Sequence, residues 1–239
     1  MVAIVDRRIS PACEMGLLKR GFRVIKLPPF SSLPEPLSSH PDMLMIASEG
    51  EIITSCAYCD EAPYVFSDIS IALQKTRLTF TSDTPGERYP YDCIFNALVI
   101  GDNLFLKTDT ASRELIALAE RRGLKLVHTN QGYPACTVLP LGGGAAITAD
   151  NGLARVLCEE GIDVTVISNA DISLPPYDYG FIGGAAGVFE DTVYFLGDPK
   201  YHRDSEKIAD AIARAGMKFV ALADEPLTDL GRIIILRDN

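Results

Sequence analysis

The stretch Gly123-Leu-Lys-Leu-Val127 decides the fold, because the same pattern recurs along the chain in the same context. Each copy follows a segment with helical patterning and begins a short apolar run. Glycine readily adopts the left-handed conformation that ends a helix, and β-branched or aromatic residues favour a strand after it. The sequence therefore predicts a repeated helix–glycine–strand junction. The other copies are Gly21-Phe-Arg-Val-Ile25, Gly161-Ile-Asp-Val-Thr165, Gly216-Met-Lys-Phe-Val220 and, without the glycine, Thr76-Arg-Leu-Thr-Phe80.

Upstream of four of these junctions lie two short apolar runs joined by a turn. The turns contain Gly, Asp or Asn, which is the usual signal of a β-hairpin. The pattern therefore predicts that each unit contains a strand, a second strand, a helix and a third strand, in that order. The paired runs are 43–46 with 52–54, 97–100 with 104–106, 137–141 with 145–148, and 185–189 with 193–196.

The two ends of the chain supply the parts of a fifth unit. Val2–Asp6 matches a second strand, a helix is expected at about 12–20, and a third strand at Phe22–Leu27. Ile233–Leu236 is a strand with no helix after it. Pairing these terminal strands would complete the unit and remove free sheet edges. A doubly wound sheet is the default interpretation of alternating strands and helices, but it needs only one strand per helix.

We therefore expect one α/β domain spanning residues 1–239, a five-bladed propeller of ββαβ units closed by its terminal strands. The expected units are 1–41 together with 229–239, 42–91, 92–135, 136–179 and 180–228. A repeat of about 40–50 residues is typical of such architectures.

Composition narrows the class of protein. The formal net charge is −10, hydrophobic residues make up 47% of the chain and charged residues 23%. An acidic globular chain repels phosphate backbones and anionic lipid, so we expect neither nucleic acid nor a membrane as a partner. The first residues lack the order of a signal peptide, and six cysteines are too few for a disulfide scaffold. These features predict a cytoplasmic protein with reduced thiols.

Five such units, joined through the chain ends, resemble the pentein fold. That fold is shared by arginine and agmatine deiminases, amidinotransferases and a ribosomal anti-association initiation factor. The resemblance covers nearly the whole chain, and four segments are similar to a bacterial branch of that superfamily. These segments are Gly132-Tyr-Pro-Ala-Cys-Thr-Val138, Ile147-Thr-Ala-Asp-Asn-Gly152, Tyr179-Gly-Phe-Ile-Gly-Gly184 and Leu227-Thr-Asp-Leu-Gly231.

In a ring of five units, the start of each first strand faces the central axis. Ungapped alignment of the hairpins places Asp42, Asn96, Cys136 and Gly184 in one register, with Gly231 as the fifth member. Polar residues at strand starts are commonly exposed turn formers, which is the alternative for each of them. We expect the set to line a pocket for a small polar ligand, together with the flanking residues His40, Asp92, Gln131, Tyr179 and Asp229.

His40-Pro41-Asp42 resembles the His-x-Asp motif of guanidino-modifying penteins. The resemblance implies that His40 is a general acid–base, that Asp42 binds a guanidinium and that a cysteine thiolate attacks its carbon. A carboxylate matches a planar cation, imidazole moves protons near neutrality, and thiolate is the reactive form of sulfur. Cys136 is the candidate nucleophile, and we expect His40 to lower its pKa.

The position of the nucleophile departs from the family pattern. Enzymatic penteins carry their cysteine in the last unit, whereas the last cysteine here is Cys158, expected to be buried on a helix. The alternative for Cys136 is a small buried apolar residue, as most unpaired cysteines are. Cys56 and Cys59 lack the further ligands of a zinc site, so no metal or cofactor is expected. His202 is expected to be exposed in a loop.

Two functions from different classes remain open. The first is an enzyme that acts on a guanidino or related carbon–nitrogen group through a thiol, with Asp42 and Asn96 holding the substrate. The second is a pentein without catalysis, which binds a small polar ligand or another protein. Fold alone does not distinguish them.

Overall fold

The computed structural model describes residues 1–237 and contains several small mixed sheets with helices around them. Within those residues, five sheets have three strands and one has two. The central strand of each three-stranded sheet pairs antiparallel with one neighbour and parallel with the other. The three-stranded sheets are β17–β1–β2 (Ile234–Leu236, Val2–Asp6, Arg23–Leu27), β3–β4–β5 (Met45–Ser48, Glu51–Ser55, Arg77–Thr81), β6–β7–β8 (Leu98–Ile100, Asn103–Leu106, Lys125–His128), β9–β10–β11 (Val138–Leu141, Ala145–Thr148, Asp163–Val166) and β13–β14–β15 (Ala186–Phe189, Thr192–Phe195, Lys218–Ala221).

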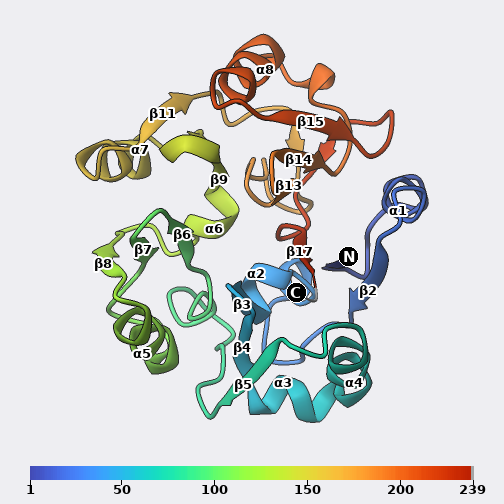
Figure 1. Cartoon of the computed structure of the whole chain (residues 1–239), viewed down its shortest axis with the longest axis vertical. Coiled ribbons are helices and arrows are strands. Elements are labelled where there is room, and N and C mark those ends of the chain that lie inside the picture. The colour runs from blue at the N-terminus through green and yellow to red at the C-terminus, as the bar shows by residue number, and fades with distance from the viewer. Residues whose placement is uncertain (238–239) are drawn as a thin grey trace.

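The longer helices connect the parallel strands of each sheet, since a parallel pair needs a crossover connection. Figure 1 shows these helices at the periphery, while strand β17 and the short helices α2 and α6 lie toward the centre. The helices are α1 (Pro11–Leu18), α2 (Pro41–Leu44), α3 (Cys56–Glu61), α4 (Pro63–Ala72), α5 (Arg113–Arg122), α6 (Pro134–Thr137), α7 (Asn151–Glu159) and α8 (Ser205–Arg214). The two-stranded sheet pairs β12 (Ile172–Ser173) with β16 (Leu227–Thr228), and short 3-10 turns lie at η1 (Glu35–Leu37), η2 (Gly142–Gly144) and η3 (Pro199–Tyr201).

The repeated junction forms as the sequence predicts. Helix α5 begins at Ser112, whose hydroxyl accepts a hydrogen bond from the Glu114 backbone N–H, and it ends at Gly123 with φ 64°. Strand β8 begins two residues later. Asp150 starts α7 in the same manner, with its carboxylate accepting from the Leu153 N–H. Local capping therefore fixes where each crossover helix begins and ends.

The first and last strands pair as predicted. Strand β17 lies antiparallel beside β1, with Val2 opposite Leu236 and Ile4 opposite Ile234. The next strand, β2, pairs parallel with β1 on its other side. The terminal segments therefore share one three-stranded sheet.

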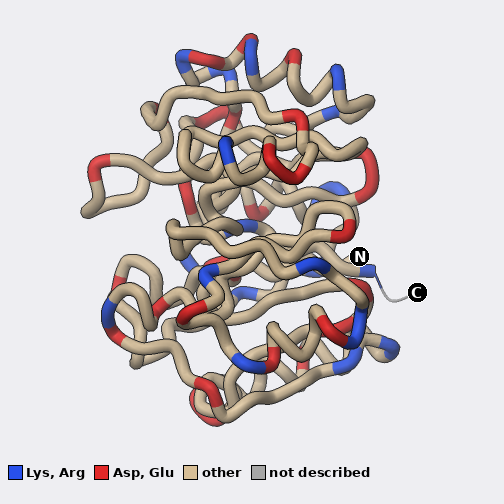
Figure 2. The backbone as a smooth tube through the Cα atoms, turned by 90° about the vertical axis from the view of Figure 1, so that its left-hand side faces the viewer, with Lys and Arg blue, Asp and Glu red and all other residues tan. Residues whose placement is uncertain are grey.

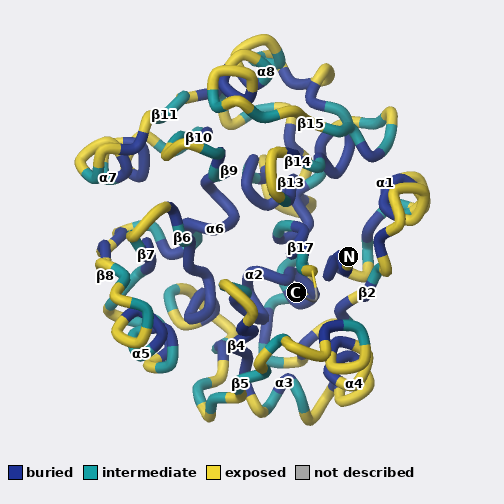
Figure 3. Tube along the Cα trace, in the orientation of Figure 1, coloured by how far each residue is buried: buried dark blue, intermediate teal, exposed yellow. Residues whose placement is uncertain are grey.

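The core consists of five apolar clusters, each of which joins two sheets. One cluster combines residues of the β17–β1–β2 sheet with β3, β4 and α4, and another combines β3 and β4 with β6, β7 and α5. A third joins β6 and β7 to β10 and α7, a fourth joins β9 and β10 to β14 and α8, and a fifth packs β1 and β17 against β14 and β15. Figure 3 shows the buried inner strands and the exposed outer faces of the helices.

Three local expectations were wrong. Met43 and Leu44 belong to helix α2, and Thr137 to α6, so Asp42 and Cys136 stand on short helices rather than at strand starts. Cys158 is exposed on α7, because the apolar face of that helix is formed by other residues. His202 is buried with 2% of its surface exposed, and its Nδ1 accepts a hydrogen bond from the Asp204 N–H.

Charged side chains lie mainly on the outer surface. Figure 2 shows acidic and basic residues interspersed along the helices and loops. In residues 1–237, no helix combines the length and apolar character needed to cross a membrane.

Candidate functional site

Two short helices carry the central polar residues. Helix α2 presents Asp42 and helix α6 presents Cys136, and both begin with a proline. Proline suits a first helical position because its φ angle is already helical and its missing N–H would have no partner there. The Asp42 N–H donates to the Gly231 carbonyl at 3.1 Å, which ties α2 to the segment before β17.

Asp42, Asn96 and Cys136 lie in direct contact. The Cys136 thiol donates to Asp42 Oδ2, with an Sγ–Oδ2 distance of 2.9 Å. Asn96 Nδ2 lies 3.1 Å from the same sulfur, and Asn96 Oδ1 accepts from the Ala135 N–H at 2.8 Å. All three side chains are buried. Three segments that are far apart in the sequence therefore meet at the Cys136 sulfur.

Burial controls the charge of this cluster. It raises the pKa of the Cys136 thiol well above its usual value, and the nearby carboxylates of Asp42 and Asp229 raise it further. Burial raises the pKa of Asp42 to about 6, although the Cys136 thiol and Arg232 act in the opposite direction. The pKa of Asp229 rises to about 7 through burial and the charge of Asp42. The expected lowering of the Cys136 pKa is therefore wrong.

His40 lies close to the cluster but makes no hydrogen bond with it. Both ring nitrogens are buried without a hydrogen-bond partner among residues 1–237. Nε2 lies 3.8 Å from Asp6 Oδ2, and the Asp6 carboxylate is already paired with Arg8 at 2.6 Å. Burial lowers the pKa of His40 to about 3, with Asp6 raising it and Arg8 lowering it. The imidazole is therefore neutral near pH 7.

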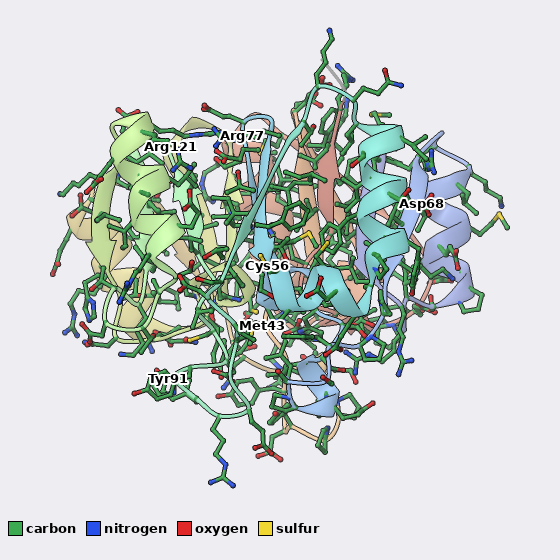
Figure 4. All side chains as sticks on the ribbon, turned by 90° about the horizontal axis from the view of Figure 1, so that it is seen from below. Met43, Cys56, Asp68, Arg77, Tyr91 and Arg121 are labelled. Carbon is green, nitrogen blue, oxygen red and sulfur yellow. The ribbon has the colours of Figure 1, made fainter. Side chains whose placement is uncertain are left out.

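A cavity of about 310 Å³ opens beside Cys136 and His40. Four aromatic rings and two carboxylates line it, and no Lys or Arg does. Figure 4 shows Met43, one of its lining residues, in the interior of the molecule, with Tyr91 toward the same end and Arg77 and Arg121 at the other. Aromatic faces and carboxylates both attract cations. The lining residues are Leu37, His40, Met43, Tyr133, Cys136, Leu174, Tyr177, Asp178, Tyr179, Phe181 and Asp229.

Five of the predicted ligand-binding residues are not among those that line the cavity, namely Asp42 and Asn96, which contact Cys136, and Asp92, Gln131 and Gly184. Asp92 accepts a hydrogen bond from the Tyr133 hydroxyl at 2.8 Å, and burial raises the Asp92 pKa. Gln131 accepts from the Tyr133 N–H through its side-chain oxygen, so both residues position Tyr133. Gly184 does not line the cavity either; a side chain there would clash with the Asp229 carboxylate.

Tyr179 and Asp229 do line the cavity. Tyr179 is 40% exposed at its edge. The Asp229 carboxylate accepts from the Phe181 N–H at 2.9 Å and from the Gly231 N–H at 3.0 Å. Asp229 is therefore held by the backbone on both sides, with 1% of its surface exposed.

Several lining residues were not predicted from the sequence, namely Tyr133, Tyr177, Asp178 and Phe181. The loop that carries the last three reads Leu-Pro-Pro-Tyr-Asp-Tyr-Gly-Phe over 174–181. Three aromatic residues within five positions of an exposed loop are an available signal, because loops that carry aromatic side chains commonly bind ligands.

The structure offers little for a metal ion. Within residues 1–237, no group of three or more His, Cys, Asp or Glu side chains is arranged to hold one. Cys56 is exposed on α3 and Cys59 is partly buried on the same helix.

The family model described as "Family of unknown function (DUF6873)" matches residues 4–234. The chain belongs to that family. No curated protein matches the sequence.

Solved structures with a similar fold are guanidino-modifying enzymes by their names. SxtG, an amidinotransferase from Microseira wollei, is 14% identical over 93% of this chain and 88% of its own, with a TM-score of 0.55. Dimethylarginine dimethylaminohydrolase from Pseudomonas aeruginosa, in complex with citrulline, is 12% identical over 93% and 92%, also with 0.55. An inosamine-phosphate amidinotransferase from Streptomyces griseus is 15% identical over 97% and 83%, with 0.50. The pentein resemblance found in the sequence is thereby confirmed for the fold.

Proposed function

We propose that this protein binds a small organic cation with a guanidino or related carbon–nitrogen group, and that Cys136 attacks that group. The observation that carries the proposal is the hydrogen bond to Asp42 from the thiol of Cys136, a residue that lines a cavity together with aromatic rings and Asp229. A nucleophile and a cation-attracting surface thus adjoin one space, and a proton acceptor lies directly behind the nucleophile.

The cavity favours a planar cation for two reasons. Tyr133, Tyr177, Tyr179 and Phe181 supply ring faces, and a cation over a ring gains about 0.5–2 kcal/mol. Asp229 supplies a carboxylate that is buried and raised in pKa, so an arriving positive charge restores its ionised form. A neutral or anionic ligand gains neither contribution.

Binding of the cation prepares the thiol. A positive charge beside Cys136 and Asp42 lowers the pKa values of both groups, which are raised in the empty site. The thiol proton then passes to Asp42 along their hydrogen bond, and the sulfur forms a bond with the guanidino carbon. A carbon–nitrogen bond breaks, and the leaving amine takes the proton from Asp42.

Release of the second product needs a water molecule. Water attacks the carbon bound to sulfur, the carbon–sulfur bond breaks and the thiol regains a proton. The neutral imidazole of His40 faces the cavity with unpartnered ring nitrogens, so it can accept the proton of that water. This assigns His40 to the second half of the reaction, since it does not contact Cys136 in the structure.

We also propose that the five three-stranded sheets are the blades of one closed five-bladed domain, with the unit boundaries expected from the sequence. Two observations support this. The terminal strands pair, and the five core clusters join the units in a cycle, including a cluster between the first unit and the last.

Cysteine labelling tests the catalytic proposal. Neutral iodoacetamide should modify the exposed Cys56 and Cys158 faster than Cys136, whose thiol is buried and protonated. A cationic haloacetamidine should reverse this order, because it binds in the cavity and lowers the thiol pKa. Asp42→Asn should slow the haloacetamidine reaction of Cys136 at least tenfold and leave Cys158 unchanged. If haloacetamidine follows the same order as iodoacetamide, Cys136 is not an activated nucleophile.

The second candidate function is a binding protein without catalysis. It is favoured by the 4% exposure of Cys136 and its raised pKa, which describe an inert thiol in the empty site. Arginine and agmatine should then raise the melting temperature saturably, while prolonged incubation releases neither ammonia nor amine. Ligand-induced release of an amine would exclude this candidate.

A further inference from the structure

A second cavity is lined by Asp42 and shares no lining residue with the aromatic one. It has a volume of about 160 Å³, well above the ~30 Å³ that one water occupies in the liquid. Its walls are apolar side chains of β3, β6 and β17. Strand β3 runs from α2 to the turn before Glu51. The Glu51 carboxylate pairs with Arg77 and Arg121, which lie at the far end of the molecule in Figure 4. Among its lining residues, only Asp42 and Arg232 carry charge.

Arg232 is held into this cavity by an unusual backbone conformation. Its φ angle is 78°, a region that bulky side chains rarely adopt, and its N–H donates to the Gly184 carbonyl at 2.8 Å. Such strain costs about 1–3 kcal/mol and tends to occur at functional sites. The segment after Asp229 thus keeps a strained backbone conformation at Arg232, and the Arg232 side chain lines the second cavity.

The Arg232 guanidinium has no hydrogen bond or ion pair with any part of residues 1–237. Arg237 on the same segment, by contrast, pairs with Glu190 at 2.9 Å. Burial lowers the pKa of Arg232, whereas the charges of Asp42 and Cys136 raise it. An arginine remains charged in proteins, so a partly buried and unpartnered guanidinium gains energy when an acceptor reaches it.

Asp42 restricts which anions can bind in this cavity. Its Oδ2 accepts from Cys136, but its Oδ1 is buried without a hydrogen-bond partner. A fully deprotonated anion on Arg232 would be repelled by this carboxylate at close range. An anion that keeps a proton would instead donate it to Oδ1.

We infer that this second cavity binds a small oxyanion that retains a proton, the class of bicarbonate and dihydrogen phosphate. Its charged oxygens accept from the Arg232 guanidinium, and its hydroxyl donates to Asp42 Oδ1. The site does not depend on the proposed catalytic function, since it shares no lining residue with the aromatic cavity and involves no thiol chemistry.

Titration near neutral pH and constant ionic strength tests this inference. Inorganic phosphate should show saturable broadening of its ³¹P resonance with the wild-type protein, and [¹³C]bicarbonate should do the same in the ¹³C spectrum. Arg232→Gln should weaken the affinity for either probe at least tenfold. Arg237→Gln, which removes an exposed arginine of the same segment, should leave it unchanged. Broadening that is absent in the wild type, or equal in Arg232→Gln, overturns the inference.

Two further measurements keep the test decisive if Arg232→Gln fails to fold. Wild-type protein should bind [¹³C]formate more weakly than bicarbonate, because formate has no hydroxyl to donate. In Asp42→Asn the repulsion by the carboxylate is gone and the amide can donate a hydrogen bond. The affinity for formate should therefore rise relative to the affinity for bicarbonate. An unchanged preference between the two anions in Asp42→Asn rejects the assigned contact with Asp42.

Discussion

Replacement of Asp42 by asparagine should stabilise the protein above about pH 6. Asparagine has the shape of a protonated aspartic acid and can still accept the hydrogen bond of the Cys136 thiol. The free-energy change therefore follows from the pKa of Asp42, which rises from 3.8 to about 6 on folding. At 1.36 kcal/mol per pH unit, ionised Asp42 destabilises the fold by about 3 kcal/mol.

The direction of the Asp42 pKa shift determines the pH range over which the stability of the fold changes. Because the folded-state pKa is the higher one, the folded protein binds more protons than the unfolded chain between pH 3.8 and about 6. The cost is absent below 3.8, grows as pH rises to about 6, and stays constant above that. Wild type should therefore lose stability through this range relative to the mutant.

Urea denaturation of both proteins at pH values from 5 to 8 measures the effect. At pH 8 we expect Asp42→Asn to be more stable by about 3 kcal/mol, or roughly 6–12 °C in melting temperature for a chain of this size. The gap should narrow toward pH 5. Asp210→Asn, at an exposed position of α8, should stay within about 0.5 kcal/mol of wild type throughout. A mutant that melts below wild type at pH 8 would refute the reasoning and make Asp42 a structural acceptor.

Two further predictions concern the surroundings of the site. Arg8→Met should destabilise the fold by about 3–5 kcal/mol, because it leaves the fully buried Asp6 carboxylate without its ion pair; chemical denaturation measures this, and a change below about 1 kcal/mol contradicts it. Gly231→Ala should cost more than about 3 kcal/mol, since its φ is +68° and a Cβ would clash with His40. Gly123→Ala, with a similar φ of +64° but open space, should cost only about 1 kcal/mol, so equal losses in the two melts would reject the clash.

The repeat was predictable because it depends on local physics. Glycine after a helix, a turn between short apolar runs and an apolar strand at each end are all visible in the sequence. The contact of Asp42, Asn96 and Cys136 followed from their common register, since equivalent positions of successive units face one another. The contact of these three residues could therefore be derived, but not their protonation.

The protonation states, the cavity wall and the environment of Arg232 depend on tertiary contacts that the sequence does not display. The pKa of Cys136 was expected to fall near a histidine, yet burial outweighs that influence and His40 itself is neutral. Much of the cavity wall comes from the loop 174–181, which lies between β12 and β13 in the sequence. Arg232 lies beside a glycine in a terminal segment, and nothing in its neighbours signals that its side chain has no partner.

The pairing of β1 with β17 has a consequence for synthesis on the ribosome. Strand β1 emerges long before its antiparallel neighbour β17, because residues 7–233 lie between them. Until then one edge of β1 is open, and the apolar cluster that includes Ala3, Val5, Ile233 and Ile235 is incomplete. An open strand edge with exposed apolar residues promotes aggregation, and contacts so distant in sequence form slowly. The nascent chain therefore has a long interval in which a chaperone that covers β1 would improve the yield of folded protein.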